Sequence, residues 1–166
     1  MIEIEKKYLV NEKWSAPKKG GEYFRQGYLA ESGATTRVRV ICPKDEPENK
    51  RAYLTIKGKT VGISRPEFEY EIPVPDAEAM LQMAIYPVIE KFRYRVPIGG
   101  KIWEVDEFLG VHKGLVIAEI ELSDENEGFK LPEWAGEEVS LDRSYSNAAL
   151  SKKAARIIAL QQKLNA

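Results

Sequence analysis

Charged and apolar residues alternate in short segments through most of this chain, beginning with Ile2-Glu3-Ile4-Glu5-Lys6-Lys7. Successive side chains of a β-strand point to opposite faces, so each segment predicts a strand with one apolar and one ionised face. After the first segment, the charged positions are Arg37, Arg39, Lys57, Glu67, Glu69, Glu71, Lys91, Arg93, Arg95, Glu104, Asp106, Glu119 and Glu121. The apolar faces must be buried, and the charged faces must be paired, metal-bound or hydrated.

The pattern predicts a mainly β (α+β) fold with eight antiparallel strands. Turns rich in glycine and proline separate the expected strands, which span residues 2–10, 23–30, 35–42, 51–58, 67–73, 91–97, 101–108 and 115–122. The later stretch from Asp124 to Glu138 is expected to be a long connecting loop unless Trp134 orders it.

Two helices are expected beside the strands. Asp76 can cap a helix that runs to about Ala84, with Pro87 shortly after its end. A second helix is expected over residues 147–164, because its apolar residues recur at helical spacing and either Ser146 or Asn147 can cap it.

Length and composition exclude several classes of protein. The 166 residues fit one domain, and a net charge of −1 gives no general basic field for binding duplex nucleic acid. A single cysteine, Cys42, excludes an internal disulfide and a cysteine-based zinc site. The lone histidine, His112, is interpreted as a turn residue. No signal peptide and no apolar run of about 18 residues occurs, so a cytoplasmic protein without a membrane span is expected.

Closing eight such strands into a barrel would remove the exposed sheet edges and could place the ionised faces around a hydrated lumen. The two helices would then partly cover the outward apolar faces. The opposite arrangement, with the apolar faces inside, is commoner in soluble barrels. Periodicity alone leaves both arrangements open.

The spacing of the charges suggests a ligand. Carboxylates two residues apart on a strand lie roughly 6–7 Å apart, so the pairs Glu3/Glu5 and Glu119/Glu121 could hold Mg²⁺ or Mn²⁺ if their strands are neighbours. The basic rows could bind phosphate oxygens. A linear triphosphate would satisfy both surfaces. The alternative is that the acids and bases only form structural salt bridges across strands.

An ordered set of motifs resembles the triphosphate tunnel metalloenzyme (CYTH) superfamily, whose signature is Glu-x-Glu-x-Lys at the N-terminus. The matching segments are Glu3-Ile-Glu-Lys-Lys7, Arg37-Val-Arg39, Leu54-Thr-Ile-Lys57, Arg65-Pro-Glu67-Phe-Glu69, Lys91-Phe-Arg93, Asp106, Glu119-Ile-Glu121 and Asp142-Arg143-Ser-Tyr-Ser-Asn147. This resemblance implies that residues 1–166 form one eight-stranded antiparallel tunnel with a charged lumen. Compact bacterial tripolyphosphatases are the most similar members.

The resemblance also implies a role for each charged group. The metal ligands would be Glu3, Glu5 and Glu119, with Glu121 and Asp106 beside a second metal or its waters. The phosphate chain would be bound by Lys7, Arg37, Arg39, Lys57, Lys91 and Arg93. Lys7 and Tyr28 would help to activate the attacking water. Glu67 and Glu69 would be supporting lumen acids, and Glu71 and Arg95 continue the same faces with less defined roles.

The implied activity is hydrolysis of inorganic tripolyphosphate to pyrophosphate and phosphate, dependent on Mg²⁺ or Mn²⁺. Other members of the superfamily are class IV adenylate cyclases, thiamine triphosphatases and RNA triphosphatases, so the group attached to the triphosphate stays open. A polyphosphate- or nucleotide-binding module without catalysis is the alternative outside the enzymes. The expected partner is a small triphosphate substrate, and incompletely covered outer strand faces favour a homodimer.

Overall fold

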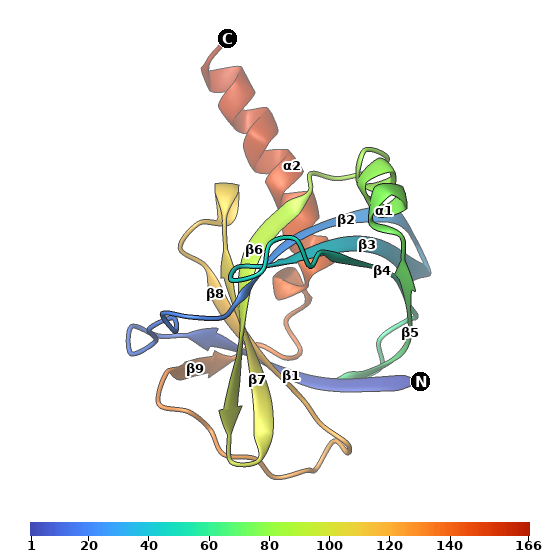
Figure 1. Cartoon of the computed structure of the whole chain (residues 1–166). Coiled ribbons are helices and arrows are strands. Elements are labelled where there is room, and N and C mark those ends of the chain that lie inside the picture. Colours follow the sequence, from blue (N-terminus) through green and yellow to red (C-terminus); the bar gives the residue numbers. More distant parts are fainter.

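One antiparallel sheet curls into a closed barrel in the computed structural model, which describes all of residues 1–166 (Figure 1). Its strands are β1 (Ile2–Val10), β2 (Glu22–Ser32), β3 (Ala34–Pro43), β4 (Arg51–Lys57), β5 (Ser64–Ile72), β6 (Ile89–Ile98), β7 (Lys101–Phe108) and β8 (Val116–Glu121). They lie side by side in the order β5-β4-β3-β2-β6-β7-β8-β1, and the first residues of β1 pair with β5 to close the barrel. The predicted eight-stranded antiparallel barrel is confirmed.

The charged strand faces point into the barrel, and most apolar faces point outward against covering elements. Val38 and Val40 of β3 pack under α1 (Val74–Leu81), contacting Ala77 and Leu81. On the other side, Trp103 and its neighbours on β7, β8 and β1 pack under loop residues. Burying each large apolar side chain contributes about 1.5–3 kcal/mol, so these covers stabilise a barrel whose interior is polar.

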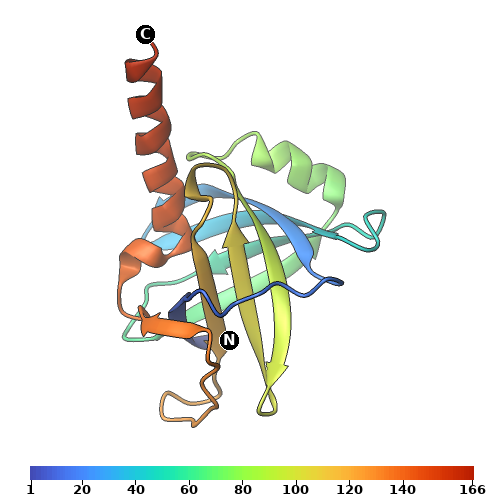
Figure 2. The ribbon, with the colours of Figure 1, turned by 90° about the vertical axis from the view of Figure 1, so that its left-hand side faces the viewer.

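One end of the lumen is closed by apolar packing. Ile89, Phe108 and Ile117 continue the inward-facing rows of β6, β7 and β8, and Leu150 of α2 (Asn147–Leu164) packs on them. The predicted second helix is confirmed, with the Ser146 hydroxyl accepting a hydrogen bond from the Ala149 N–H at 3.1 Å. Figure 2 shows that only the beginning of α2 lies against the barrel and that its C-terminal part extends away.

His112 helps to hold this helix in place. It lies in a single 3-10 turn (Gly110–His112), as a turn residue, but it is buried. Its Nε2 atom is 2.8 Å from the Leu150 carbonyl oxygen. The histidine therefore serves the packing of α2.

The first helix differs from the prediction at both ends. It begins at Val74 rather than at a capping Asp76, because Pro75 in its first turn lacks an N–H that would need a cap. Asp76 lies inside that first turn, where its charge faces the positive end of the helix dipole. The helix ends at Leu81, and the following N–H groups of Met83 and Ala84 bond to carbonyls three residues back.

A short ninth strand was not predicted. β9 (Ala135–Glu138) pairs with the second half of β1 outside the barrel, within the stretch expected to be a loop. Trp134 orders it, with its ring centroid 5.2 Å from that of Trp14 and 5.6 Å from that of Trp103. Gly136 allows the close approach to β1, because a Cβ atom there would lie 2.9 Å from the Leu9 carbonyl oxygen.

Some outward apolar side chains remain uncovered. On β4 and β5, Ile56, Phe68 and Tyr70 are exposed, and Ile2 of β1 is exposed near them. Neither α1 nor α2 combines the length and hydropathy that crossing a bilayer requires.

Candidate functional site

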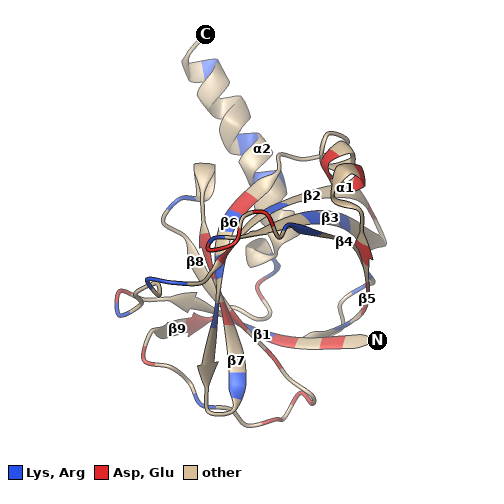
Figure 3. Cartoon of the chain, viewed as in Figure 1, with Lys and Arg blue, Asp and Glu red and all other residues tan.

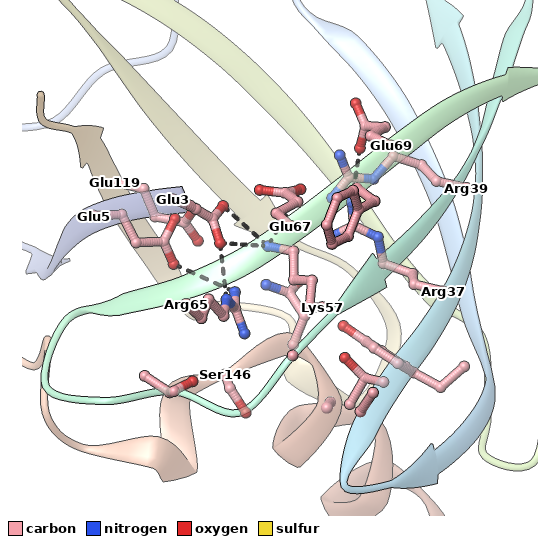
Figure 4. A pocket seen from close by; sticks show the side chains of 18 of the residues that line it. Glu3, Glu5, Arg37, Arg39, Lys57, Arg65, Glu67, Glu69, Glu119 and Ser146 are labelled. Carbon is pink, nitrogen blue, oxygen red and sulfur yellow. Dashed lines mark hydrogen bonds and ion pairs between the residues drawn. The ribbon is translucent and has the colours of Figure 1, made fainter. Parts of the chain in front are cut away.

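The barrel encloses a cavity of about 860 Å³, whose wall is mostly charged. Figure 3 shows acidic residues along β1 and basic residues on β3 and β4 across the barrel. In Figure 4, Glu3, Glu5 and Glu119 gather on one side, Arg37 and Arg39 lie on the other, and Lys57 lies between them. The charged faces predicted from the sequence therefore meet in one site.

The acidic side of the cavity is built by β1 and β8. Glu5 is the register partner of Glu121, and Lys7 is the register partner of Glu119. The Glu3 carboxylate accepts hydrogen bonds from Lys57 Nζ at 3.0 and 3.1 Å and from Arg65 Nε at 2.8 Å. Burial alone would raise the pKa of Glu3, but Lys57 and Arg65 lower it to about 2.

Glu5 is only weakly compensated. Its only ion pair, with Arg65, is long, at 3.8 Å, and it accepts no side-chain hydrogen bond. Burial and the neighbouring charges of Glu119 and Glu3 raise its pKa to about 7, although Lys7 opposes this shift. Three clustered carboxylates that repel one another are what a bound dication would neutralise.

The donor set fits a hard divalent cation. It consists of the carboxylates of Glu3, Glu5, Glu119 and the more exposed Glu121, and it contains no histidine or cysteine. Such oxygen ligands suit Mg²⁺ or Mn²⁺ rather than zinc. As the side chains stand, no three His, Cys, Asp or Glu groups converge as the ligands of one ion would.

The basic side contains donors that the protein leaves free. Arg37 donates to Thr55 Oγ1 at 3.1 Å and lies 3.4 Å from Glu69, but its buried Nε atom has no partner. Arg39 is 9% exposed and donates only to the side-chain oxygen of Gln26, at 3.0 Å. Arg39 forms no ion pair with a carboxylate. Burial, Arg37 and Arg93 lower the pKa of Arg39 to about 9, which leaves it charged near neutrality.

Two of the predicted site residues lie behind the cavity wall. Lys91 and Asp106 have no exposed surface and do not line the cavity. Lys91 Nζ donates to Asp106 Oδ2 at 2.6 Å, and Arg93 donates to both oxygens of Asp106 at 2.6 and 2.7 Å. Arg93 itself reaches the cavity. Asp106 thus lies within a buried cation cluster and apart from Glu3 and Glu5.

Lys7 and Tyr28 both line the cavity and are both buried. Lys7 Nζ lies 3.6 Å from Glu119 and donates to the Tyr145 carbonyl at 3.4 Å. Burial alone would lower the pKa of Lys7, but Glu119 and Glu5 raise it above its ordinary value. Burial raises the pKa of Tyr28 and outweighs the nearby Arg37 and Arg39. Both side chains are therefore protonated near neutral pH and can donate hydrogen bonds.

The acids of β5 face the basic wall. Glu69 accepts from the Thr55 hydroxyl at 2.8 Å, and Glu67 lies 3.7 Å from Lys57. Arg95, at the edge of the cavity, pairs with Glu104 at 3.3 Å and also with Glu22. These contacts hold the basic side chains in position.

The sequence prediction gave no role in the site to four residues that the structure places there. Arg65 contacts Glu3 across the closing seam of the barrel. Phe24 lies beneath the cations, with its ring centroid 4.8 Å from Arg39 Cζ and 5.2 Å from Arg93 Cζ. Gln26 and Asn147 hydrogen-bond each other beside Arg39. Because the prediction rested on rows of charge, Phe24 and Gln26 gave no signal. Arg65 and Asn147 lie within the family motifs, but the resemblance gave them no role in the site.

Comparison with known proteins gives consistent matches along the chain. Residues 1–156 match the CYTH domain family. An inorganic triphosphatase of Acetivibrio thermocellus is 49% identical over 152 residues, covering 90% of this chain and 93% of that protein. One from Nitrosomonas europaea is 33% identical over 159 residues, covering 91% and 97%. The crystal structure of an inorganic triphosphatase has a TM-score of 0.61 at 29% identity, covering 90% of this chain and 93% of that one.

Proposed function

The chain belongs to the CYTH domain family, and on this premise we propose that it hydrolyses inorganic tripolyphosphate to pyrophosphate and phosphate. Family membership implies dependence on a divalent metal, and we propose Mg²⁺ or Mn²⁺ from the all-carboxylate donor set. Two relatives that each match about nine-tenths of the chain carry the name inorganic triphosphatase. The proposal extends that activity to this protein.

The observation that carries the proposal is the incompletely satisfied pair of arginines on the basic wall. Arg39 is nearly buried without a carboxylate partner, and Arg37 has a buried Nε with no acceptor. Burying an unpaired charge is costly, so a purely structural set of salt bridges would not leave these groups free. A polyphosphate chain would supply the missing acceptors, because guanidinium groups match phosphate oxygens in pairs.

The roles of the side chains follow from their places on the wall. Arg37, Arg39, Arg93 and Lys57 would bind the phosphate oxygens and neutralise the charge that shifts toward the leaving group. Lys91 would act from behind, by holding Asp106 against Arg93. We place Asp106 in this supporting role in preference to metal ligation.

Glu3, Glu5 and Glu119 would hold the metal, with Glu121 beside them. A bound dication would supply charge neutralisation at the phosphate and favour deprotonation of a bound water. Lys7 and Tyr28, both protonated, would orient the attacking water and the terminal phosphoryl group as hydrogen-bond donors. Glu67 and Glu69 would keep Lys57 and Arg37 in position.

The shape of the site favours a bare triphosphate over a nucleotide. α2 and the apolar cluster around Leu150 close one end of the lumen. The wall is dominated by charged and polar groups, with 7 hydrophobic residues among the 31 that line it. A nucleobase would find little apolar surface there, whereas a linear polyanion meets charge along the cavity.

A substrate panel tests the proposal. Purified protein is supplied with tripolyphosphate, ATP, GTP and thiamine triphosphate, each with Mg²⁺ or Mn²⁺, and phosphate, pyrophosphate and cyclic nucleotide are measured. We expect tripolyphosphate to be cleaved fastest, with one phosphate and one pyrophosphate formed per molecule. Cyclic AMP as the main product would support a cyclase instead, and binding without turnover of any substrate would support a binding module.

We also propose a homodimer formed through the outer apolar face of β4 and β5. Ile56, Phe68 and Tyr70 are exposed there, and contiguous apolar surface of this kind commonly marks an interface. Size-exclusion chromatography with light scattering measures the molar mass of the protein in solution and tests this proposal. A monomer at all concentrations would contradict this proposal without affecting the enzymatic one.

A further inference from the structure

Two uncharged amide side chains connect the basic wall to the first turn of α2. Gln26 has no exposed surface and is the register partner of Arg39 on β3. Its Oε1 accepts from Arg39 Nε at 3.0 Å, and its Nε2 donates to Asn147 Oδ1 at 2.8 Å. Asn147 is the first residue of α2, and the same Oδ1 atom accepts from Lys91 Nζ at 3.1 Å.

The connection continues to the second buried arginine. Lys91 Nζ donates to Asp106, which accepts both hydrogen bonds of Arg93. We call this continuous set of contacts the amide relay, and its members in order are Arg39, Gln26, Asn147, Lys91, Asp106 and Arg93. Both ends of the relay, Arg39 and Arg93, line the cavity, while Lys91 and Asp106 do not.

The orientation of each amide in the relay follows from donor chemistry. Arginine and lysine side chains have donors and no acceptors. Arg39 therefore requires the oxygen of Gln26, which turns the Gln26 nitrogen toward Asn147. Lys91 requires the oxygen of Asn147, and this oxygen also accepts from the Gln26 nitrogen. Only one arrangement satisfies all the contacts, so the relay has a defined geometry.

Arg39 depends on this geometry because little else fixes its direction. Its guanidinium lies over the Phe24 ring, which permits sliding and rotation, and no carboxylate pairs with it. Gln26 is its one hydrogen-bond acceptor. A group that binds a phosphate chain must be held close to its productive position, because small displacements lose much of its effect.

We propose that Gln26 and Asn147 are positioning residues that use the docked first turn of α2 to set Arg39 for the phosphate chain. This inference rests on the proposed tripolyphosphatase activity. Docking of α2 is then a requirement of substrate binding, in addition to closing the lumen. Gln26 does not line the cavity and acts through Arg39. Asn147 lines the cavity, but its Oδ1 atom accepts from Gln26 and Lys91, so its contact with Arg39 also runs through Gln26.

Substitutions that break the relay test the effect on substrate binding. Asn147→Ala removes the shared acceptor and Gln26→Leu removes both hydrogen bonds at similar volume. Each should raise the tripolyphosphate KM about tenfold with a smaller change in kcat, the effect expected for losing one hydrogen bond to a charged group. The KM of the double variant should be about equal to that of either single variant, because the two residues act through one relay. Asn147→Asp keeps an acceptor and should raise KM less than Asn147→Ala does.

Ser151→Ala is the matched control. Ser151 is also a buried residue of α2, and its hydroxyl donates to the Pro87 carbonyl at 2.7 Å, away from the relay. This variant should lower the melting temperature and leave KM unchanged. If Ser151→Ala raised KM as much as Asn147→Ala does, loosening of α2 would explain the effect and the relay would not.

A spectroscopic readout tests the relay without requiring activity. The Arg39 Nε–H group should give a distinct ¹H–¹⁵N signal, assigned by its loss in Arg39→Lys. This signal should shift in Asn147→Ala, although Asn147 does not touch Arg39, and should stay in place in Ser151→Ala. An unmoved signal in Asn147→Ala would overturn the inference.

Absence of tripolyphosphate cleavage by the wild type, with the signal shifting as expected, would overturn the proposed function and leave the relay as a structural feature. Cleavage with unchanged KM in both relay variants would show that the relay does not position Arg39 for substrate.

Discussion

Asp106 lies directly behind Arg93, and its two carboxylate oxygens accept hydrogen bonds from Arg93 Nε and Nη2 at 2.6 and 2.7 Å. Burial alone would raise the pKa of Asp106, but Arg93 and Lys91 hold it below its usual range. Both oxygens of the carboxylate are therefore occupied by contacts with Arg93 and Lys91. These contacts favour a supporting role for Asp106 over the metal ligation that the family resemblance suggested.

Asp106→Asn should destabilise the protein without weakening metal binding. Leaving Arg93 as a buried cation with a neutral partner behind it should cost about 3–5 kcal/mol of unfolding free energy, the usual result of removing one member of a buried ion pair. Urea unfolding measures this loss. Glu104→Gln is the control on the same strand, since Glu104 also pairs with Arg93 but is partly exposed, and it should cost under about 1 kcal/mol.

Metal binding is measured separately by titrating the Asp106→Asn protein with Mn²⁺. An affinity equal to that of the wild type is expected. A large loss of Mn²⁺ affinity in a folded Asp106→Asn protein would show that Asp106 takes part in metal binding.

Glu5→Gln should abolish metal-dependent turnover in a protein that stays folded. Glu5 has one long ion pair and lies among other carboxylates, so its charge adds little to stability. Under the proposed function this charge binds the metal. We expect kcat to fall at least about a hundredfold, which is of the order found when a catalytic electrostatic contact is removed. The melting temperature should be unchanged or higher, because a buried repulsion is removed.

Glu138→Gln is the control for Glu5, since Glu138 is on β9 next to β1 but pairs with Lys6 outside the barrel. It should keep the wild-type rate. A Glu5→Gln protein with a wild-type rate at every Mn²⁺ concentration would show that the acidic cluster is not the metal site.

The barrel and its charged wall could be predicted because strand periodicity fixes which residues share a face. Glu3 and Glu5 had to lie together, as did Arg37 and Arg39, once their segments formed strands. The choice of the inner face could not come from periodicity, since either face satisfies the same alternation. It came from the resemblance to a family and agrees with the structure.

The remaining errors have local physical causes. β5 begins at Ser64, three residues before the predicted start, because its first residues, Pro66 among them, pair with β1 at the seam of the barrel. β9 has no alternation to detect and depends on the packing of the distant Trp14. The amides Gln26 and Asn147 acquire their role only when β2 and α2 meet, which no local pattern encodes.

Arg37→Lys should weaken tripolyphosphate binding without greatly changing the fold. Lysine keeps the positive charge but loses the Nε donor that has no partner within the protein. The KM should rise about tenfold, because a hydrogen bond between charged groups contributes roughly 1.5–3 kcal/mol and 1.4 kcal/mol corresponds to a factor of ten. Arg25→Lys is the matched control, since Arg25 lies on the outer face of β2 and pairs with Glu78 of α1. It should leave KM unchanged, and equal effects of the two variants would argue against a phosphate contact at Arg37.

Tyr28→Phe should lower kcat without moving the pH dependence of the rate. Burial raises the pKa of Tyr28 above its ordinary value near 10, despite the attraction of Arg37 and Arg39 for a phenolate. The phenol is therefore protonated across the range near neutrality, and its loss removes a hydrogen-bond donor and no titrating base. Rates measured from about pH 6 to pH 10 with saturating metal should fall by a constant factor of about ten. Tyr53→Phe serves as a comparison on β4, because Tyr53 does not line the cavity and should not affect the rate. If the rising limb of the wild-type profile disappeared in Tyr28→Phe alone, the phenolate would be the base that activates water, and the donor role assigned to Tyr28 would be wrong.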